Sequence, residues 1–315
     1  MIALDEIRAA RERLGDAITP TPLVRADVAA PGEIWLKLEC LQPIGSFKLR
    51  GGLSAVRAAT VAELADGVVT ASAGNMAQGV AWAAREAGVP ATIVAPETAP
   101  RTKLDAVERL GGRVIRVPHE VWWQTMLDRG HPEAPGFFVH PVADRAVMAG
   151  NGTIGLELCE QLDEFDTVVV PWGGGGLTCG IAGAVKALRP GARIVTAEPA
   201  TAAPLAAAFA AGEPVEIDFR PSFVDGAGGR ALLPGMWELA RELVDEAAAV
   251  PLDEVAAAMR LLAGRARVVA EGAGALALAA ALSGAAGGSR VVCIVSGGNV
   301  DPTVLAAVLN GETPG

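Results

Sequence analysis

The sequence predicts an α/β fold with parallel open sheets that helices cover on both faces. Short apolar, β-branched runs alternate with longer helical segments from about residue 34 to residue 309, and this alternation is typical of βα units. Three of the runs end in small residues that open the next helix, at 67–75, 167–177 and 291–299. Ligands of such sheets gather where strand carboxyl ends meet helix amino ends, so we expect these three turns to surround one crevice.

The other elements follow in chain order. Residues 1–13 form a charged amphipathic segment that predicts a helix ahead of the first strand. Apolar patterning predicts seven further helices, at 76–87, 101–110, 121–129, 152–162, 177–188, 251–264 and 271–282. Glycine and proline mark loops at 130–136 and 284–289. No repeat of fixed period is present, and a chain of this length holds one large or two modest domains.

Composition excludes several classes of protein. Of the 315 residues 51% are hydrophobic and the mean hydropathy is +0.36, which excludes disorder, yet no apolar run is long enough to cross a bilayer. The formal net charge of −10 argues against a nucleic-acid surface, so we expect small-molecule partners and no membrane partner. The first residues lack the order of a signal peptide, which makes the cytoplasm the expected location.

Cysteine and histidine give no sign of a metal site. The four cysteines show no C-x-x-C spacing and three of them lie among apolar or small residues, so we expect buried thiols rather than disulfides or zinc ligands. They are Cys40, Cys159, Cys179 and Cys293. The three histidines show no helical metal spacing and are expected in loops or at the solvent surface. The sequence therefore predicts no transition-metal site.

A candidate nucleophile lies in the segment SFKLR at 46–50. Lys48 stands between Phe47 and Leu49, ahead of two glycines, in an apolar and tightly turned setting. A lysine desolvated in this way can lose its proton and attack a carbonyl group. The alternative is a surface lysine whose stem alone is buried.

Four consecutive glycines, at 173–176, form a candidate phosphate site. Without Cβ atoms, several backbone N–H groups can approach one phosphate, and the helix that starts near Leu177 adds its positive end. A flexible turn or a dinucleotide site are the alternatives. Against a dinucleotide, the preceding strand lies mid-chain, and Glu198, the acid that could hold a ribose, has no other nucleotide feature near it.

Together these segments resemble a known family. SFKLRG, then SAGNMAQG at 72–79, GGGGL at 173–177 and SGGNVD at 296–301 resemble, in this order, the fold type II pyridoxal-phosphate enzymes, most closely the threonine/serine dehydratase and serine racemase family. The resemblance extends to AGNGTIGLEL at 149–158 and to residues 224–226. It implies pyridoxal 5′-phosphate as cofactor and a homodimer. It also implies two doubly wound open-sheet domains of the tryptophan synthase β-like kind: a small mobile domain at 52–141 and a large cofactor-binding domain formed by 1–51 and 142–315.

The resemblance assigns cofactor-binding roles residue by residue. Lys48 would bind the cofactor covalently and then remove the substrate's Cα proton, with Phe47 packed beside it or stacked on the cofactor ring. Asn75 would donate its amide to the phenolic oxygen, although capping of the next helix is an alternative. Ser296 would face the pyridine nitrogen. The phosphate would lie on the glycine loop, formed by Gly173, Gly174, Gly175, Gly176 and Leu177.

The substrate carboxylate would bind at the segment SAGNM. Its members are Ser72, Ala73, Gly74, Asn75 and Met76, and the N–H groups that open the following helix contribute there.

The hydroxyl of Ser296 favours one type of reaction. Unlike a carboxylate, it does not enforce protonation of the cofactor ring, so a long-lived carbanion is disfavoured and prompt loss of a β-substituent is favoured. We expect a dehydratase, or ammonia-lyase, that converts a serine- or threonine-like amino acid to a 2-oxo acid and ammonia. β-Replacement or racemisation on the same fold, and a non-catalytic protein that binds pyridoxal phosphate, are the alternatives.

Several positions depart from the family pattern. Ala73 stands where serine racemases carry a second serine that acts as acid or base on the opposite face, which argues against racemisation. Met76 replaces the usual histidine, Trp172 the usual valine and Gly272 the usual proline. The family's divalent-cation site would use Glu198 and an acid a few residues on, but Pro204 and alanines occupy that stretch, so no bound cation is expected.

Substrate size is the last expectation. Met76, Trp172 and the pair Trp122–Trp123 could together form an apolar wall that favours a bulkier β-hydroxy amino acid, whereas plain core packing is the alternative. Arg230 adds either a second anion contact or a solvated surface residue.

Overall fold

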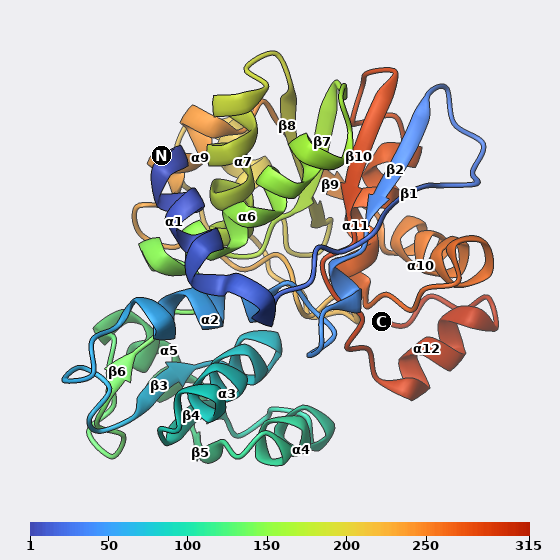
Figure 1. The fold of residues 1–315 in the computed structure, drawn as a ribbon. Helices are drawn as coiled ribbons and strands as arrows, with labels where there is room; N and C mark the ends of the chain where they lie inside the picture. Colours follow the sequence, from blue (N-terminus) through green and yellow to red (C-terminus); the bar gives the residue numbers. More distant parts are fainter.

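The computed structural model describes residues 1–315, whose ten strands form two separate sheets (Figure 1). The larger sheet has six strands in the order β1, β2, β10, β7, β8, β9. Only β1 and β2 are antiparallel, and every other neighbouring pair is parallel. The strands are β1 (Leu23–Arg25), β2 (Glu33–Lys37), β7 (Thr167–Pro171), β8 (Arg193–Pro199), β9 (Glu246–Val250) and β10 (Arg290–Ile294).

The smaller sheet has four parallel strands in the order β5, β4, β3, β6. They are β3 (Val68–Ala71), β4 (Ala91–Pro96), β5 (Arg113–Val117) and β6 (Phe137–Phe138), with helices α3 (Asn75–Ala87), α4 (Arg101–Arg109) and α5 (His119–Asp128) between them. All four strands fall inside the predicted small domain, 52–141, and the six others fall outside it. The exact limits of the domains stay a prediction, because helix α2 (Lys48–Ala58) continues across residue 51.

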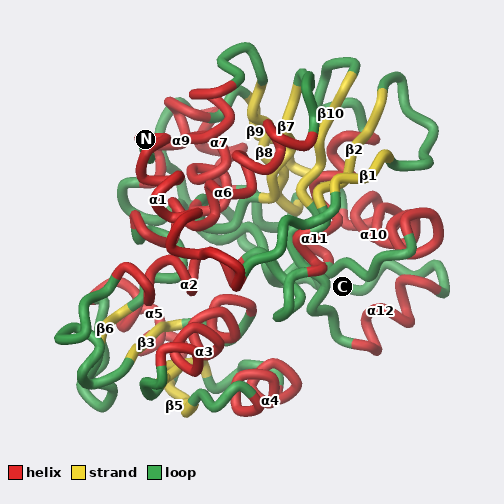
Figure 2. Tube along the Cα trace, in the orientation of Figure 1, coloured by secondary structure: helices red, strands yellow, loops and turns green.

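Helices cover both faces of the larger sheet, as the doubly wound prediction requires (Figure 2). Alternate residues of β7 show the two sides: Val169 joins one apolar core, whereas Val168 and Val170 join the other. The first core includes residues of α10 (Leu252–Leu261) and α11 (Gly272–Leu282), and the second includes residues of α1 (Leu4–Leu14), α6 (Arg145–Gln161) and α7 (Gly176–Leu188). The remaining helices are α8 (Pro204–Ala211), α9 (Met236–Leu243) and α12 (Pro302–Leu309). None of the helices is both long and apolar enough to span a bilayer.

The seven helices predicted after the first strand are all present, but α6 begins at Arg145 rather than near residue 152. Glycines inside helices hide such elements from a sequence pattern, and α2 is missed for the same reason. A Cβ on Gly52 of α2 would lie 2.7 Å from the backbone of Gly79 in α3, so these helices need glycine to pack closely. The predicted fold class is confirmed.

Candidate active site

Two of the predicted turns lie at the carboxyl ends of neighbouring strands, and the third reaches them from the smaller sheet. The glycine loop follows β7 and the segment that begins at Ser296 follows β10, which pairs with β7. The lysine segment lies against this last turn: Phe47 N–H donates to the Ser296 carbonyl at 3.0 Å, and Gly298 N–H donates to the Gly45 carbonyl at 2.8 Å. The third turn, after β3, joins them through Asn75, whose side-chain oxygen accepts from Asn299 Nδ2 at 2.7 Å.

Lys48 is the first residue of α2, and its ammonium group has one protein acceptor. Nζ donates to the Pro141 carbonyl at 2.8 Å and lies 5.2 Å from the centroid of the Phe47 ring. Burial lowers the pKa of Lys48 to about 8, while the negative charge of Glu271 acts in the opposite direction. A substantial fraction of this amine is therefore neutral near pH 8, as a base or nucleophile requires. Phe47 also packs against the core that contains α6 and α7, which supports the packing interpretation of its role.

The acceptor of Lys48 belongs to a tight turn that sequence reasoning missed. His140 Nδ1 accepts from the N–H groups of Val142, at 3.1 Å, and Ala143, at 2.8 Å, and so shapes the turn that presents the Pro141 carbonyl. Burial, followed by the charges of Arg129 and Lys48, lowers the pKa of His140 to about 4. The imidazole is therefore neutral, and this histidine lies in a loop as predicted but is buried.

The glycine loop carries a row of unpaired donors. The backbone N–H groups of residues 173–177 donate to no protein acceptor, and the Thr178 hydroxyl beside them is buried without a partner. Gly175 has φ +95°, and a Cβ there would lie 2.4 Å from the Trp172 ring, so only glycine fits. The Leu177 side chain is buried in the core, which leaves its backbone N–H to act at the loop. Such a row at a helix amino end is suited to a phosphate group.

A second row of donors opens α3. The N–H groups of Ala73, Asn75, Met76 and Ala77 have no protein acceptor, and the Ser72 hydroxyl accepts from Gly74 N–H at 3.3 Å. The helix begins after Gly74, so Asn75 does not cap it with its side chain. These groups are suited to a carboxylate. The side chain of Met76, however, is buried against the small-sheet core, so only its backbone can contact a substrate.

Asn75 connects the part of the molecule that carries the smaller sheet with the part that carries the larger sheet. Its Nδ2 donates to Glu271 Oε1 at 2.7 Å, and its oxygen accepts from Asn299. Burial, together with the charge of Asp225, raises the pKa of the Glu271 carboxyl to about 7. Sequence reasoning missed this acid, and the only local signal is a carboxylate among apolar residues at a helix start. Ser296 is 97% shielded from solvent directly after β10, and its predicted role toward a pyridine nitrogen stays a prediction.

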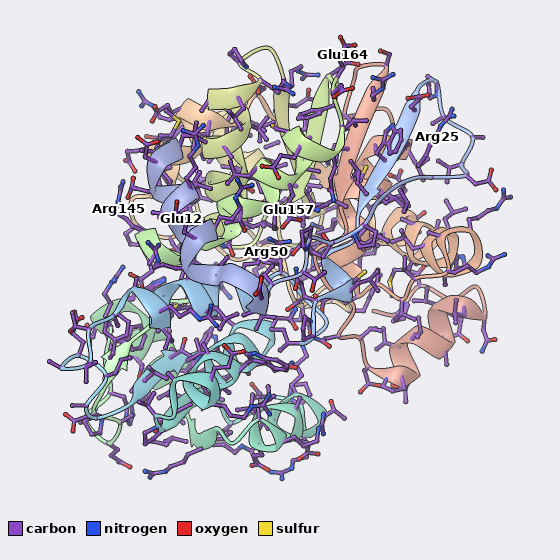
Figure 3. All side chains as sticks on the ribbon, viewed as in Figure 1. Glu12, Arg25, Arg50, Arg145, Glu157 and Glu164 are labelled. Carbon is purple, nitrogen blue, oxygen red and sulfur yellow. The ribbon has the colours of Figure 1, made fainter.

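A buried ionic cluster anchors the helix that carries Lys48. Arg50 donates to the carboxylates of Glu39 and Glu157, and Lys37 pairs with Glu157 as well. Figure 3 labels Arg50 and Glu157, which meet from α2 and α6. All four side chains are buried. The two positive and two negative groups balance, which is how charges become tolerable in a protein interior. The cluster holds α2 against β2 and α6, two residues after Lys48.

The predicted apolar wall does not form. Trp172 is fully buried in the core with α6 and α7, whereas Met76 lies in the small-sheet core. Trp122 packs against a separate cluster formed by β3, β4 and β5, and Trp123 is 39% exposed. These side chains belong to different clusters because each follows the face of its own strand or helix. Arg230 is exposed, which agrees with a solvated residue.

The remaining predicted features are placed as follows. All four cysteines are free, and three of them are buried, as expected. The Glu198 carboxylate is buried and accepts from the N–H groups of Leu205, at 3.1 Å, and Ala206, at 2.8 Å, in the first turn of α8. Burial raises its pKa to about 8.

The residues of this site fit pyridoxal phosphate. Five successive unpaired N–H groups can take the phosphate, a lysine of lowered pKa can bind the aldehyde, and Asn75 has a second amide hydrogen for the phenolic oxygen. The hydroxyl of Ser296 lies on the neighbouring turn. The backbone carbonyl of Ser296 accepts the Phe47 N–H, which joins this turn to the lysine segment. Cofactor and substrate roles carried over from the resemblance stay predictions for each residue.

Comparisons with known proteins agree with this arrangement. The chain is 38% identical to the L-threonine ammonia-lyase of Thermotoga maritima over 317 residues, which cover 98% of this chain and 79% of that protein. It is 37% identical to the serine racemase of Oryza sativa subsp. indica, over 96% of this chain and 92% of that protein. Among solved structures, maize serine racemase superposes with a TM-score of 0.89 at 34% identity and 98% coverage of both chains.

The family inferred from the motifs is therefore confirmed, and so is its cofactor. Residues 14–297 match the family described as pyridoxal-phosphate dependent enzyme. With near-complete coverage and identity well above 30%, this protein belongs to the pyridoxal-phosphate-dependent enzyme family and has its type II fold.

Proposed function

We propose that the protein is an ammonia-lyase that removes the β-hydroxyl of L-threonine or L-serine to give a 2-oxo acid and ammonia. One observation carries the proposal: Lys48, with its lowered pKa, lies beside two helix amino ends whose N–H groups are unpaired. The similarity to L-threonine ammonia-lyase supports the same reaction.

The residues divide the work of this reaction. Bound pyridoxal phosphate supplies an electron sink for the negative charge that develops at the substrate's Cα. The α3 amino end holds the substrate carboxylate, and the neutral amine of Lys48 takes the Cα proton. The electron pair left at Cα forms a double bond to Cβ as the Cβ–O bond breaks, and the leaving hydroxyl takes up one proton to become water. This proton balances the Cα proton that Lys48 holds. The released enamine then hydrolyses to the 2-oxo acid and ammonia.

The substrate we propose is small. Serine and threonine differ by one methyl group, and a hydrophobic pocket discriminates a methylene by about 1–3 kcal/mol. Trp122 and Trp123 form a pair on α5 with ring centroids 6.2 Å apart, whereas Trp172 and Met76 lie in two other cores, so the four side chains do not form one wall that would favour a bulkier β-hydroxy amino acid. We further propose a cytoplasmic homodimer, on the strength of the family resemblance.

Racemisation is the second candidate, because a serine racemase matches the chain at nearly the same identity as the ammonia-lyase. It needs an acid on the face opposite to Lys48. The matching position carries Ala73, whose methyl group packs beside Ala95, Ala99 and Leu104. Elimination is therefore favoured over racemisation. No observation favours β-replacement, and an intact Lys48 argues against a non-catalytic protein.

The proposal is tested by measuring ammonia and 2-oxo acid from L-threonine and L-serine. The purified protein should be yellow, and kcat should rise about tenfold per pH unit below pH 8 and level off above it, because the neutral form of Lys48 is the base. Lys48→Ala should abolish turnover while the glycine loop still binds added cofactor. Lys186→Ala is the matched control and should keep full activity. Lys186 lies on α7 and pairs with Asp245. A yellow protein that releases no ammonia from any β-hydroxy amino acid would refute the proposal.

A further inference from the structure

The carboxylate of Glu271 is the strongest feature that the proposed reaction leaves unused. It is buried, it ends the turn before α11, and its Oε1 accepts the Asn75 amide at 2.7 Å. Its own N–H donates to the Gly297 carbonyl at 3.0 Å, and a Cβ on Gly297 would lie 2.3 Å from Oε1. The carboxylate therefore lies directly against the turn that follows Ser296.

Four charged or titratable groups interact with this carboxylate, and Gly297 places it near the lysine segment, because a Cβ there would lie 2.3 Å from Oε1 and 3.2 Å from Ser46 Cβ. Lys48, on α2, is stabilised in its charged form by Glu271, and the thiol of Cys40 is disfavoured as thiolate by the same charge. Asp225, in the long segment after α8, repels the carboxylate and raises its pKa, whereas Lys103, on α4, attracts it and lowers its pKa. Cys40 is buried and Lys48 is partly buried, whereas Asp225 and Lys103 lie at the surface.

Lys103 and Asp225 form an ion pair between the two halves of the molecule. Lys103 belongs to α4 beside the smaller sheet, and Asp225 belongs to the part that carries the larger sheet. Their side chains are 24% and 53% exposed. Asn75, also from the smaller-sheet half, reaches Glu271 and Asn299 of the other half. Glu271 thus accepts from Asn75 and lies close to the turn that carries Asp225, since a Cβ on Gly226 would lie 3.7 Å from Oε1.

We propose that Glu271 is a positioning residue that holds the Asn75 amide in place and couples the charge state around Lys48 to the Lys103–Asp225 pair. Glu271 accepts from the Asn75 amide nitrogen, and Asn299 donates to the Asn75 amide oxygen. These two hydrogen bonds fix the orientation of the Asn75 amide. The charge of Glu271 favours the protonated form of Lys48. A change in the Lys103–Asp225 pair alters the pKa of Glu271. The resulting change in the charge of Glu271 alters in turn the protonation of Lys48.

The inference rests on the proposed function only in taking Lys48 as the residue that binds the cofactor. It is tested on the holoenzyme by following the visible absorbance of bound pyridoxal phosphate as a function of pH, a measurement that needs no turnover. We expect a step near neutral pH that reports the titration of Glu271. Glu271→Gln keeps an acceptor for Asn75 but cannot ionise, so the step should vanish.

The two flanking variants give the decisive comparison. Asp225→Asn removes the repelling charge, so the step should move to lower pH by up to about one unit; Lys103→Met removes the attracting charge, so it should move to higher pH by a similar amount. An ion pair that served only to hold the halves together would give the same change in both variants. Glu198→Gln, at a buried carboxylate with no contact to Lys48, should leave the step in place.

Shifts in the same direction, or no shift in either flanking variant, would overturn the inference. The decision does not depend on the folding of Glu271→Gln, because Lys103 and Asp225 are partly exposed and their substitutions remove only a surface pair. Failure of the proposed function is distinguishable: the absorbance would titrate as described while no ammonia appeared.

Discussion

Ala73 is the single residue that most directly separates elimination from racemisation. Its methyl group packs beside Ala95 of β4, Ala99 and Leu104 of α4, and alanine itself carries no proton that it could donate. Racemisation requires a proton to be delivered to the face opposite to the one from which it is removed, which under the proposed function is the Lys48 face. An alanine leaves that face without an acid.

We therefore predict that the protein converts L-serine to the 2-oxo acid and ammonia with little D-serine formed, and that Ala73→Ser raises D-serine formation. A positioned acid typically contributes about 10²–10⁴-fold, so even a poorly aligned serine should give a measurable increase. Chiral chromatography of early time points measures both products. Ala83→Ser, within α3 and away from the crevice, controls for an added hydroxyl. Abundant D-serine from the unaltered protein would contradict the prediction.

Sequence reasoning identifies some of these residues and not others. Lys48 and Ser296 are identifiable because each lies within a local motif at the end of a strand or the start of a helix. Glu271 is not, since its role depends on an amide that lies 196 positions away in the chain. Met76 is placed in the right segment, but its side chain faces the core, because the second residue of α3 points toward α2.

At the scale of elements, α2 is the helix on which the site depends. Its first residue is Lys48, and its third, Arg50, is bound by the carboxylates of Glu39 and Glu157. The strands and the helices that follow them are predictable, because β-branched runs and glycine turns are local signals. Helix α2 is not, because it exists through long-range packing against α3 and through this ionic cluster.

The cluster predicts a large difference between two arginines of the same helix. Arg50→Met leaves two buried carboxylates with one cation and should cost about 3–5 kcal/mol in the free energy of unfolding. Arg57→Met breaks a pair with Glu86 whose side chains are 35% and 34% exposed, together with hydrogen bonds to the Arg13 and Leu14 carbonyls, and should cost about 1–2 kcal/mol. Urea denaturation followed by circular dichroism measures both. Equal losses would mean that the buried cluster contributes no more than a surface ion pair.

At the scale of the whole molecule, the chain builds several separate apolar cores rather than one. Two cores lie on opposite faces of the larger sheet and a third lies beneath the smaller sheet. The order of elements predicts parallel, doubly wound sheets, whereas the division into two domains and the position of the smaller one come from the family resemblance. The assignment of each tryptophan to a core does not, because it depends on which face of a strand or helix the side chain takes.

This separation predicts that the tryptophans set stability and not substrate choice. Trp172→Val removes a fully buried ring and should cost somewhat less than the about 3–5 kcal/mol typical of buried tryptophan to alanine, since valine refills part of the space and the unpaired indole N–H is removed. Trp123→Ala, at a side chain 39% exposed, should change stability by no more than about 0.5 kcal/mol.

In both variants the ratio of kcat/KM for threonine to that for phenylserine should equal the ratio of the unaltered protein. The physical reason is that the Trp172 ring packs behind the glycine loop, where it touches Gly175, and the Trp123 ring faces solvent on α5, so neither supplies a common surface to the substrate. Thermal unfolding and steady-state kinetics on the same preparations separate the two effects. A ratio that shifts about tenfold in Trp123→Ala, without loss of stability, would place that ring against the substrate and restore the apolar wall that the separate cores contradict.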